Sequence, residues 1–220
     1  MEEENWDVIV VGAGPAGSSA ALELANAGYR VKVIDKERVI PDGRYKACGG
    51  AMAWELVEEV NYPAELIARE IESLNLHHVD GELYHKDGKG AVVWRATFDK
   101  YVLDLAIQAG ADFEENTPLL QIEENTEDTS AVEYLIRTPS KELHSKFVIA
   151  ADGVNSPTLK QLGFPAFTKD DLVLTITQEV HVGAEKIAEC LGPDSVHLFF
   201  GCENFISMGY AWLFPKEDVI

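Results

Sequence analysis

The chain has 220 residues, of which 46% are hydrophobic and 25% are charged, and this composition is typical of a soluble globular protein with one large domain or two small ones. Its net charge of -20 argues against a polyanionic partner such as nucleic acid. No run of about eighteen apolar residues occurs, so no membrane span is expected, and the acidic N-terminus does not have the apolar core of a signal peptide.

The three cysteines, Cys48, Cys190 and Cys202, are odd in number and far apart in the sequence. No cluster of Cys or His residues has the spacing of a metal site. Free thiols persist in a reducing compartment, so we expect a cytoplasmic protein without a metal centre.

The chain opens with a predicted strand at residues 8–11, a glycine fingerprint of the form G-x-G-x-x-G, and a predicted helix at residues 18–27. Gly12 permits a tight turn, Gly14 lets a pyrophosphate approach the backbone, and Gly17 lets the helix lie close to the strand. The backbone amides at the start of the helix then face an anion. The predicted phosphate cradle comprises Gly12, Ala13, Gly14, Pro15, Ala16 and Gly17.

The second predicted strand covers residues 30–35 and ends in Asp35. A carboxylate at this point of a βαβ unit accepts the ribose hydroxyls of an adenosine. The two strands, the glycine fingerprint, the helix and the terminal acid stand in the required order. This order favours a dinucleotide site over a glycine-rich turn that binds nothing.

The next part of the chain predicts a polar loop at residues 36–50, then two short helices and three short antiparallel strands. The predicted helices cover residues 52–60 and 63–69, and the predicted strands cover residues 73–79, 82–86 and 91–95. Glycine turns at Gly81 and at residues 87–88 separate these strands.

The second half of the chain returns to the pattern of the first strands and then changes. The sequence predicts a helix at residues 98–109 and a strand at 112–114. A three-stranded meander is predicted at residues 118–123, 131–138 and 142–145, with a turn at 125–128. A second buried strand at residues 146–151 and a short helix after Pro157 follow. Long strand candidates at residues 172–182, 195–201 and 206–214 then predict a second sheet.

Several separated segments resemble the geranylgeranyl reductase family of flavoproteins. Residues 150–156 match the A-D-G-x-x-S element of the p-hydroxybenzoate hydroxylase fold, and residues 210–215 match the Y-x-W-x-F-P motif of geranylgeranyl reductases. Residues 45–50 are similar to that family's cysteine-glycine loop beside the flavin, and residues 94–99 are similar to its R-x-x-F-D element. Together with the glycine fingerprint, these segments extend the resemblance along the whole chain.

The resemblance implies FAD as the cofactor and an α/β fold. It implies a Rossmann-type FAD-binding domain, with a parallel sheet and a three-stranded meander, plus part of an antiparallel-sheet substrate domain. We assign residues 1–70 and 97–165 to the FAD-binding domain and residues 71–96 and 166–220 to the substrate domain. Such flavoproteins carry a further G-D element past the Y-x-W-x-F-P motif, which this sequence lacks, so the chain resembles the N-terminal part of a longer enzyme.

The resemblance also implies roles for the polar residues around the cofactor. The glycine cradle binds the pyrophosphate of FAD, and Asp35 holds its ribose. Lys36 and Arg44 are either cations that face the phosphates or solvated loop charges. Arg95 matches a cofactor-contacting arginine of the family, and the alternative is a surface charge at the end of a strand.

Two further loops are expected near the flavin. Asp152 shapes the turn that brings Gly153 near the cofactor, and we expect no direct catalytic role for its carboxylate. Cys48 is a candidate catalytic residue, because a thiol beside the flavin tunes the flavin, gates the substrate or relays a proton. The alternative is a small buried hydrophobic residue, which most free cysteines are. Gly49 and Gly50 let the backbone approach the flavin ring.

Tyr210, Trp212 and Phe214 alternate along the last predicted strand, so they point to one face of it. That face either lines a tunnel for a long apolar chain or forms an ordinary sheet core. The resemblance favours the tunnel, and the three aromatic residues are therefore the candidate substrate contacts.

The implied reaction is reduction of carbon-carbon double bonds in a geranylgeranyl chain of a lipid or prenyl diphosphate, by hydride transfer from reduced FAD. The proton comes from water or from Cys48. The external electron donor is either NADPH or a ferredoxin-type protein, and the sequence does not distinguish them. Peripheral contact with a membrane follows from the resemblance alone. Two alternatives stay open: a flavin-dependent monooxygenase or halogenase, and a truncated FAD-binding fragment without catalysis.

Overall fold

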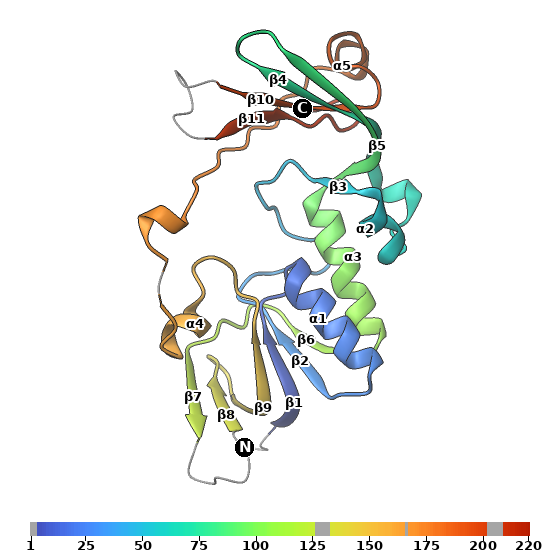
Figure 1. The fold of residues 1–220 in the computed structure, drawn as a ribbon. Helices are drawn as coiled ribbons and strands as arrows, with labels where there is room; N and C mark the ends of the chain where they lie inside the picture. The colour runs from blue at the N-terminus through green and yellow to red at the C-terminus, as the bar shows by residue number, and fades with distance from the viewer. Residues whose placement is uncertain (1–3, 126–132, 166, 202–208) are drawn as a thin grey trace. The chain divides into compact units, whose positions relative to one another are not determined.

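The computed structural model describes residues 4–125, 133–165, 167–201 and 209–220. The chain divides into two compact units, the first comprising Met1–Arg44 and Asp99–Leu174 and the second comprising Tyr45–Phe98 and Thr175–Ile220. Each unit has its own β-sheet (Figure 1). Cys202 and the predicted segments 126–128, 131–132 and 206–208 lie outside the described residues.

The first unit contains a six-stranded sheet in the order β6-β2-β1-β9-β8-β7. Its parallel part consists of β1 (Glu4–Val11), β2 (Val31–Ile34), β6 (Asp112–Glu114) and β9 (Glu142–Ala150). The antiparallel part consists of β7 (Gln121–Asn125) and β8 (Glu133–Arg137), which form a meander with β9. The predicted parallel sheet with a three-stranded meander is confirmed.

Alternate side chains of β1 enter two separate cores, because successive residues of a strand point to opposite faces of the sheet. Helices α1 (Pro15–Asn26) and α3 (Arg95–Gln108) lie on one face (Figure 1). The strand residues of the core on this face are Val8, Val10, Val31 and Val33. The core on the opposite face contains Ile9, Val11, Ile34, Leu119, Ile122, Ile136 and Leu143. Complete burial of each such side chain stabilises the fold by about 1.5–3 kcal/mol.

β9 is one continuous strand, whereas the sequence predicts two strands, at residues 142–145 and 146–151. Its first residues pair with β8, and almost its whole length pairs with β1, from Leu143 opposite Glu4 to Ala150 opposite Val11. The prediction of two strands was wrong because one strand takes part in both the meander and the parallel sheet. Part of β9 also faces outward, since Phe147 is 66% exposed.

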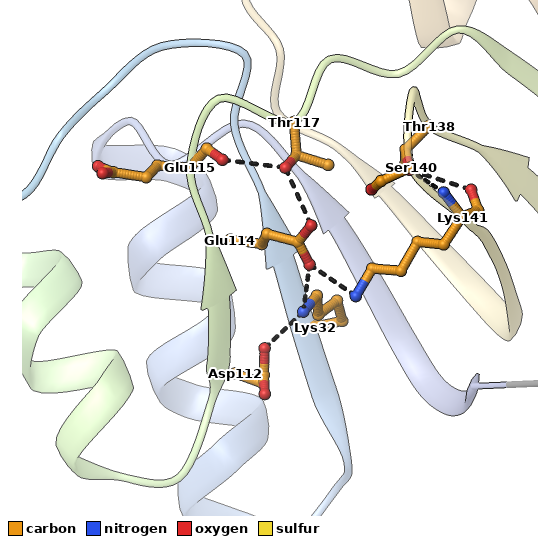
Figure 2. Close-up of polar contacts among 8 residues, drawn as sticks. All are labelled: Lys32, Asp112, Glu114, Glu115, Thr117, Thr138, Ser140 and Lys141. Atoms are coloured by element: carbon orange, nitrogen blue, oxygen red, sulfur yellow. Dashed lines mark hydrogen bonds and ion pairs between the residues drawn. The ribbon is translucent and has the colours of Figure 1, made fainter. Parts of the chain in front are cut away.

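Lys32 is a buried lysine in the middle of β2, with a side chain that is 5% exposed. Its ammonium lies 2.6 Å from Asp112 Oδ1 and 2.8 Å from Glu114 Oε2, both on β6 (Figure 2). The Lys141 ammonium reaches the same Glu114 oxygen at 2.7 Å, and the Thr117 hydroxyl donates to Glu114 Oε1 at 3.1 Å. Burial raises the pKa of Glu114, but the bonds from Lys141 and Lys32 outweigh it and lower the pKa to about 2. These charges attach the short strand β6 to β2.

The second unit contains a five-stranded sheet in the order β11-β10-β4-β5-β3. Its strands are β3 (Ala51–Ala53), β4 (Ile67–His78), β5 (Leu83–Val93), β10 (Ser195–Phe200) and β11 (Tyr210–Leu213). Neighbouring strands are antiparallel except β4 and β10, which run parallel. The predicted second sheet is confirmed, with this one parallel pair as a difference.

Short helices connect the strands of both units. They are α2 (Trp54–Glu59), the 3-10 helix Ala64–Leu66, α4 (Pro157–Gln161), the 3-10 helix Lys169–Asp171 and α5 (Ala184–Leu191). The helix predicted at residues 63–69 is only one short turn, because β4 begins at Ile67. α5 has no counterpart among the elements predicted from the sequence. Among the described residues, no helix combines the length and the apolar character needed to cross a membrane.

The turn predicted at residues 87–88 is absent, because β5 runs through these residues without interruption. β4 pairs with β5 on both sides of that point, and a register shift between Ile71 and Ser73 accommodates the irregularity. The turn predicted at Gly81 is confirmed, since the Gly81 amide donates to His78 O at 3.0 Å. Long-range pairing therefore overrides the local turn signal of an Asp-Gly pair within a strand.

The strand predicted at residues 172–182 does not form. Val173 and Leu174 are 82% and 90% exposed, although their sequence is typical of a strand. Within the described residues, only the end of this segment pairs with another segment, where the Val180 amide donates to Ile220 O at 2.8 Å. A run of β-branched residues predicts a strand only when a partner strand is present to accept its hydrogen bonds.

The loop before β3 packs against the aromatic residues at the end of the second sheet. A Cβ atom added at Gly49 would overlap the Phe214 ring and lie 3.0 Å from Trp212 Nε1. The ring centroids of Tyr210 and Trp212 are 6.0 Å apart, and those of Trp212 and Phe214 are 6.3 Å apart. These three rings, called the aromatic row below, follow one another along one face, as their alternation predicts.

We expect Gly49→Ala to lower the free energy of unfolding by about 1–3 kcal/mol, because the added methyl group forces the Phe214 ring to move. Gly88→Ala is the matched control, since a Cβ atom there meets nothing within 4 Å. Urea denaturation of the full chain, followed by circular dichroism, measures both variants. Equal unfolding midpoints for the two variants would contradict this packing.

We expect Glu114→Gln to destabilise the chain by about 1–2 kcal/mol at neutral pH, because Lys32 and Lys141 lose a charged partner. The folded pKa of Glu114 is lowered, so its stabilisation is complete above the ordinary value of 4.5 and is lost as the pH falls toward about 2. The difference in stability between wild type and variant should therefore shrink over this range. Glu142→Gln, which removes an exposed partner of Arg137, is the control. If the stability difference between wild type and Glu114→Gln did not change with pH, the lowered pKa of Glu114 would be contradicted.

Candidate functional site

The fingerprint turn at the end of β1 depends on two close backbone approaches. Gly12 has a φ of +105°, and a Cβ atom there would overlap the carbonyl oxygen of Ala151. A Cβ atom at Gly17 would overlap the Gly12 carbonyl oxygen, so α1 lies directly against the turn. The Gly12 amide donates to Ile34 O at 2.8 Å, which fixes the turn to β2.

α1 begins with backbone amides that no side chain caps. Its first residue is Pro15, which has no N–H, and the extended Gly14 before it has no side chain. The amides of Ala16 and Gly17 lie in the first turn, where a helix provides no backbone acceptor. A Cβ atom at Gly14 would meet only Arg44 Nη2, at 3.4 Å. The first turn of α1 therefore offers bare amides and the positive end of a helix to an anion.

Asp35 follows β2 and is 4% exposed. Its Oδ2 accepts from the Ala13 amide at 2.7 Å and from Arg44 Nη1 at 2.6 Å. Its Oδ1 accepts from the Glu37 amide at 2.9 Å. These three bonds hold the carboxylate in one orientation beside the fingerprint turn.

Arg44 lies beside the fingerprint with a side chain that is 11% exposed. Its Nε–H is buried and has no hydrogen-bond partner among the described residues. A buried donor without an acceptor costs free energy, and the phosphate oxygens of a dinucleotide are suitable acceptors. Bare amides and an unpaired guanidinium donor in one place therefore fit the diphosphate of FAD. Lys36, in contrast, is exposed and has no hydrogen bond or ion pair within the described part of the chain.

The turn after β9 meets the fingerprint turn, since a Cβ atom at Gly12 would also lie 3.0 Å from Asp152 Cα. Asp152 Oδ2 accepts from the amide and the hydroxyl of Thr158 at 3.0 and 2.7 Å, which ties this turn to α4. Asp152 Oδ1 is buried without a partner among the described residues. Gly153 has a φ of +84°, and a Cβ atom there would meet nothing within 4 Å. The fingerprint and the A-D-G segment thus lie together in the first unit.

The second unit holds the remaining candidate residues. Gly50 has a φ of +81°, and its carbonyl accepts from the Val93 amide at 3.0 Å, which attaches the cysteine-glycine loop to β5. Cys48, in the same loop, is half-buried and forms no disulfide. Arg95 is the first residue of α3 and is partly exposed.

A cavity of about 470 Å³ lies beside the aromatic row in the second unit and is called the aromatic cavity below. Gly49, Trp212 and Phe214 line it, so the cysteine-glycine loop and the aromatic row share one wall. Its apolar lining residues also include Ile176, Val180, Val182, Leu213 and Ile220. Lys216 lines it too, and the sequence analysis missed this residue. The only signal in the sequence was a lysine directly after the Y-x-W-x-F-P motif.

Known proteins resemble the chain along almost its whole length. The FAD binding domain family matches residues 5–215. Digeranylgeranylglycerophospholipid reductase 2 of Methanopyrus kandleri is 32% identical over 97% of this chain and 52% of its own length. Geranylgeranyl diphosphate reductase of Rhodobacter capsulatus is 31% identical over 96% of this chain and 52% of its own length. The chain therefore spans about half the length of the curated relatives it matches.

A solved structure agrees with these relatives. The geranylgeranyl bacteriochlorophyll reductase-like protein of Thermoplasma acidophilum has a TM-score of 0.74 and 26% sequence identity, with 99% of this chain and 55% of that chain covered. The expected α/β flavoprotein fold, the cofactor FAD and the resemblance to geranylgeranyl reductases are confirmed. The chain belongs to the FAD binding domain family, with geranylgeranyl reductases among its relatives.

Proposed function

We propose that this chain is part of an enzyme that reduces carbon-carbon double bonds of a geranylgeranyl chain with reduced FAD. The contact between Gly49 and the rings of Trp212 and Phe214 carries the proposal. It joins the cysteine-glycine loop to the aromatic row, and both segments resemble those of geranylgeranyl reductases. The relatives are named as reductases, which favours this activity over oxygen-dependent hydroxylation or halogenation.

The proposed substrate carries its geranylgeranyl chain on a lipid or on a diphosphate, as the names of the two relatives indicate for those proteins. An external donor, NADPH or a ferredoxin-type protein, supplies the electrons. A lipid substrate would also require the otherwise cytoplasmic protein to contact a membrane at its surface. All of these statements concern the whole enzyme, of which this chain corresponds to about half.

The first unit is proposed to hold the nucleotide part of FAD. The amides of Ala16 and Gly17 and the unpaired Nε–H of Arg44 donate hydrogen bonds to the diphosphate. Asp35 accepts from the ribose hydroxyls, and its bond to the Ala13 amide keeps it beside the diphosphate. In its reduced form, bound FAD supplies the hydride.

The second unit is proposed to position the substrate. Trp212 and Phe214 remove the apolar chain from water and hold it in one place, which matters because an isolated double bond is a poor hydride acceptor. Gly49 has no side chain, so the backbone of its loop can lie close to the flavin. Cys48 stands next to Gly49 and is the proposed residue that holds or relays a proton there.

We expect Arg44→Met to weaken FAD binding about tenfold or more, because the diphosphate loses a charged donor. Arg38→Met is the matched control, since Arg38 lies on the same loop and, among the described residues, donates to the backbone at Ile40 alone. Quenching of flavin fluorescence on titration with the full chain measures both dissociation constants. Identical constants for the two variants would remove Arg44 from the proposed FAD site.

Anaerobic incubation of the FAD-loaded whole enzyme, which contains this chain, with dithionite and geranylgeranyl diphosphate tests the activity. Mass spectrometry counts the hydrogens gained. We expect Cys48→Ala to lower the rate about tenfold or more, because the proton relay is lost. Cys190→Ala, which removes an exposed thiol on α5, should leave the rate unchanged. Unchanged turnover in Cys48→Ala would rule out the relay, and failure of the wild-type whole enzyme to reduce either this substrate or a digeranylgeranyl lipid would overturn the proposed function.

A further inference from the structure

Lys216 is a buried lysine at the end of the aromatic row. The residue is 3% exposed, whereas lysines are almost never fully buried unless they are paired. It lines the aromatic cavity together with Gly49 and Trp212. A cation in this mainly apolar lining needs a physical explanation, because even partial removal of an ammonium group from water costs free energy.

The Lys216 ammonium has no acidic partner in the part of the chain that the structure describes. No hydrogen bond or ion pair joins its Nζ to a described residue. The Nζ instead lies 4.4 Å from the centroid of the Trp94 ring, which is a cation-π contact. A ring face does not satisfy the three N–H donors of an ammonium. Lys216 therefore lines the cavity and carries donors that have no partner in the described part of the chain.

The nearest charged neighbours do not neutralise this cation. The Glu217 carboxylate accepts the indole N–H of Trp94 at 3.1 Å instead of pairing with Lys216. Arg69 adds a second positive charge, since its guanidinium donates to the carbonyl oxygens of Lys216 at 2.7 Å and Glu217 at 2.9 Å. Within the described residues, Arg69 forms no ion pair either. Lys216 and Arg69 therefore place two positive charges close together, and neither forms an ion pair among the described residues.

The pKa of Lys216 points the same way. Burial is the largest influence and lowers it, and Glu179, Cys48 and Glu217 offset only part of that effect. Glu179 lines the cavity but forms no ion pair with Lys216 among the described contacts. These three groups only partly offset the effect of burial on Lys216. An anion in the cavity would stabilise the charged form of this lysine further. The remaining lining is mainly apolar, so the same ligand needs a hydrophobic part.

We propose that the aromatic cavity binds an amphiphile that combines an apolar chain with a phosphate group, and that Lys216 recognises the phosphate. The proposal rests on the function proposed above for the isoprenoid nature of the chain. The apolar wall binds the chain by removing it from water. The ammonium donates hydrogen bonds to the phosphate oxygens, and the low dielectric of the cavity strengthens them.

Binding of geranylgeranyl monophosphate and of geranylgeraniol to the full chain tests this proposal without any turnover. The two probes have the same apolar chain and differ only in the phosphate. By equilibrium dialysis, wild type should bind the phosphate probe about tenfold more tightly or better. Lys216→Met should abolish this preference, whereas Lys216→Arg should retain most of it. Lys186→Met, which removes an exposed lysine paired with Glu189, should leave the preference unchanged.

Equal affinity of wild type for the two probes would overturn the proposal, and so would a preference that survives in Lys216→Met. If circular dichroism shows that Lys216→Met is unfolded, the role of Lys216 is tested with Lys216→Arg and with a salt titration of wild type. The preference must then persist in Lys216→Arg and decrease as the salt concentration rises, and failure of either overturns the assignment.

Two further measurements complete the test. One identifies the source of the phosphate group, and the other distinguishes failure of this proposal from failure of the proposed function. Binding to neutral-lipid vesicles that contain digeranylgeranylglyceryl phosphate, if it depends on Lys216, assigns the site to a phospholipid. If only the binding of geranylgeranyl monophosphate depends on Lys216, the site is assigned to a prenyl phosphate. FAD affinity is measured in the same samples. FAD binding without a phosphate preference overturns only the inference about Lys216, whereas a phosphate preference without FAD binding overturns only the proposed flavin-dependent function.

Discussion

The close backbone approach at Gly12 and Gly17 is the constraint on which the first unit depends. A side chain at Gly12 would overlap the carbonyl of Ala151, and one at Gly17 would overlap the carbonyl of Gly12. Neither glycine has a side chain. The end of β1 can therefore lie in close contact with both the start of α1 and the turn after β9. Asp35 then reaches the Ala13 amide and fixes this arrangement to the end of β2. The bare amides of the anion site follow from the packing of the backbone, and Arg44 adds a charged donor beside them.

The second unit uses glycine for a different purpose. Gly49 allows a loop to contact aromatic rings, and the result is an apolar cavity wall to which Trp212 and Phe214 contribute. Lys216 is the exception on this wall, since it places a positive charge in a mainly apolar lining. A stable fold does not require that charge. Residues that reduce stability in this way are typical of binding sites, where a ligand supplies the missing partner.

The local parts of the fold could be read from the sequence, and the parts that depend on distant pairing could not. The strand of β1, the fingerprint and Asp35 follow one another closely, and each has its own local signal. β9 was divided into two because the sequence does not show that β1 accompanies it along almost its whole length. An Asp-Gly pair at residues 87–88 signals a turn, but pairing with β4 keeps these residues in β5. Residues 172–182 have strand composition, but along most of their length they pair with no strand that the structure describes.

The sequence by itself determined the βαβ nucleotide unit, the second sheet and the resemblance to geranylgeranyl reductases, because these depend on residue types at fixed short spacings. Only the tertiary structure decided that Gly49 contacts the aromatic row, that Arg44 has an unpaired buried donor, and that Lys216 is buried at a cavity without an acidic partner among the described residues. Burial and hydrogen-bond satisfaction depend on which distant segments meet, and a one-dimensional pattern does not contain that information.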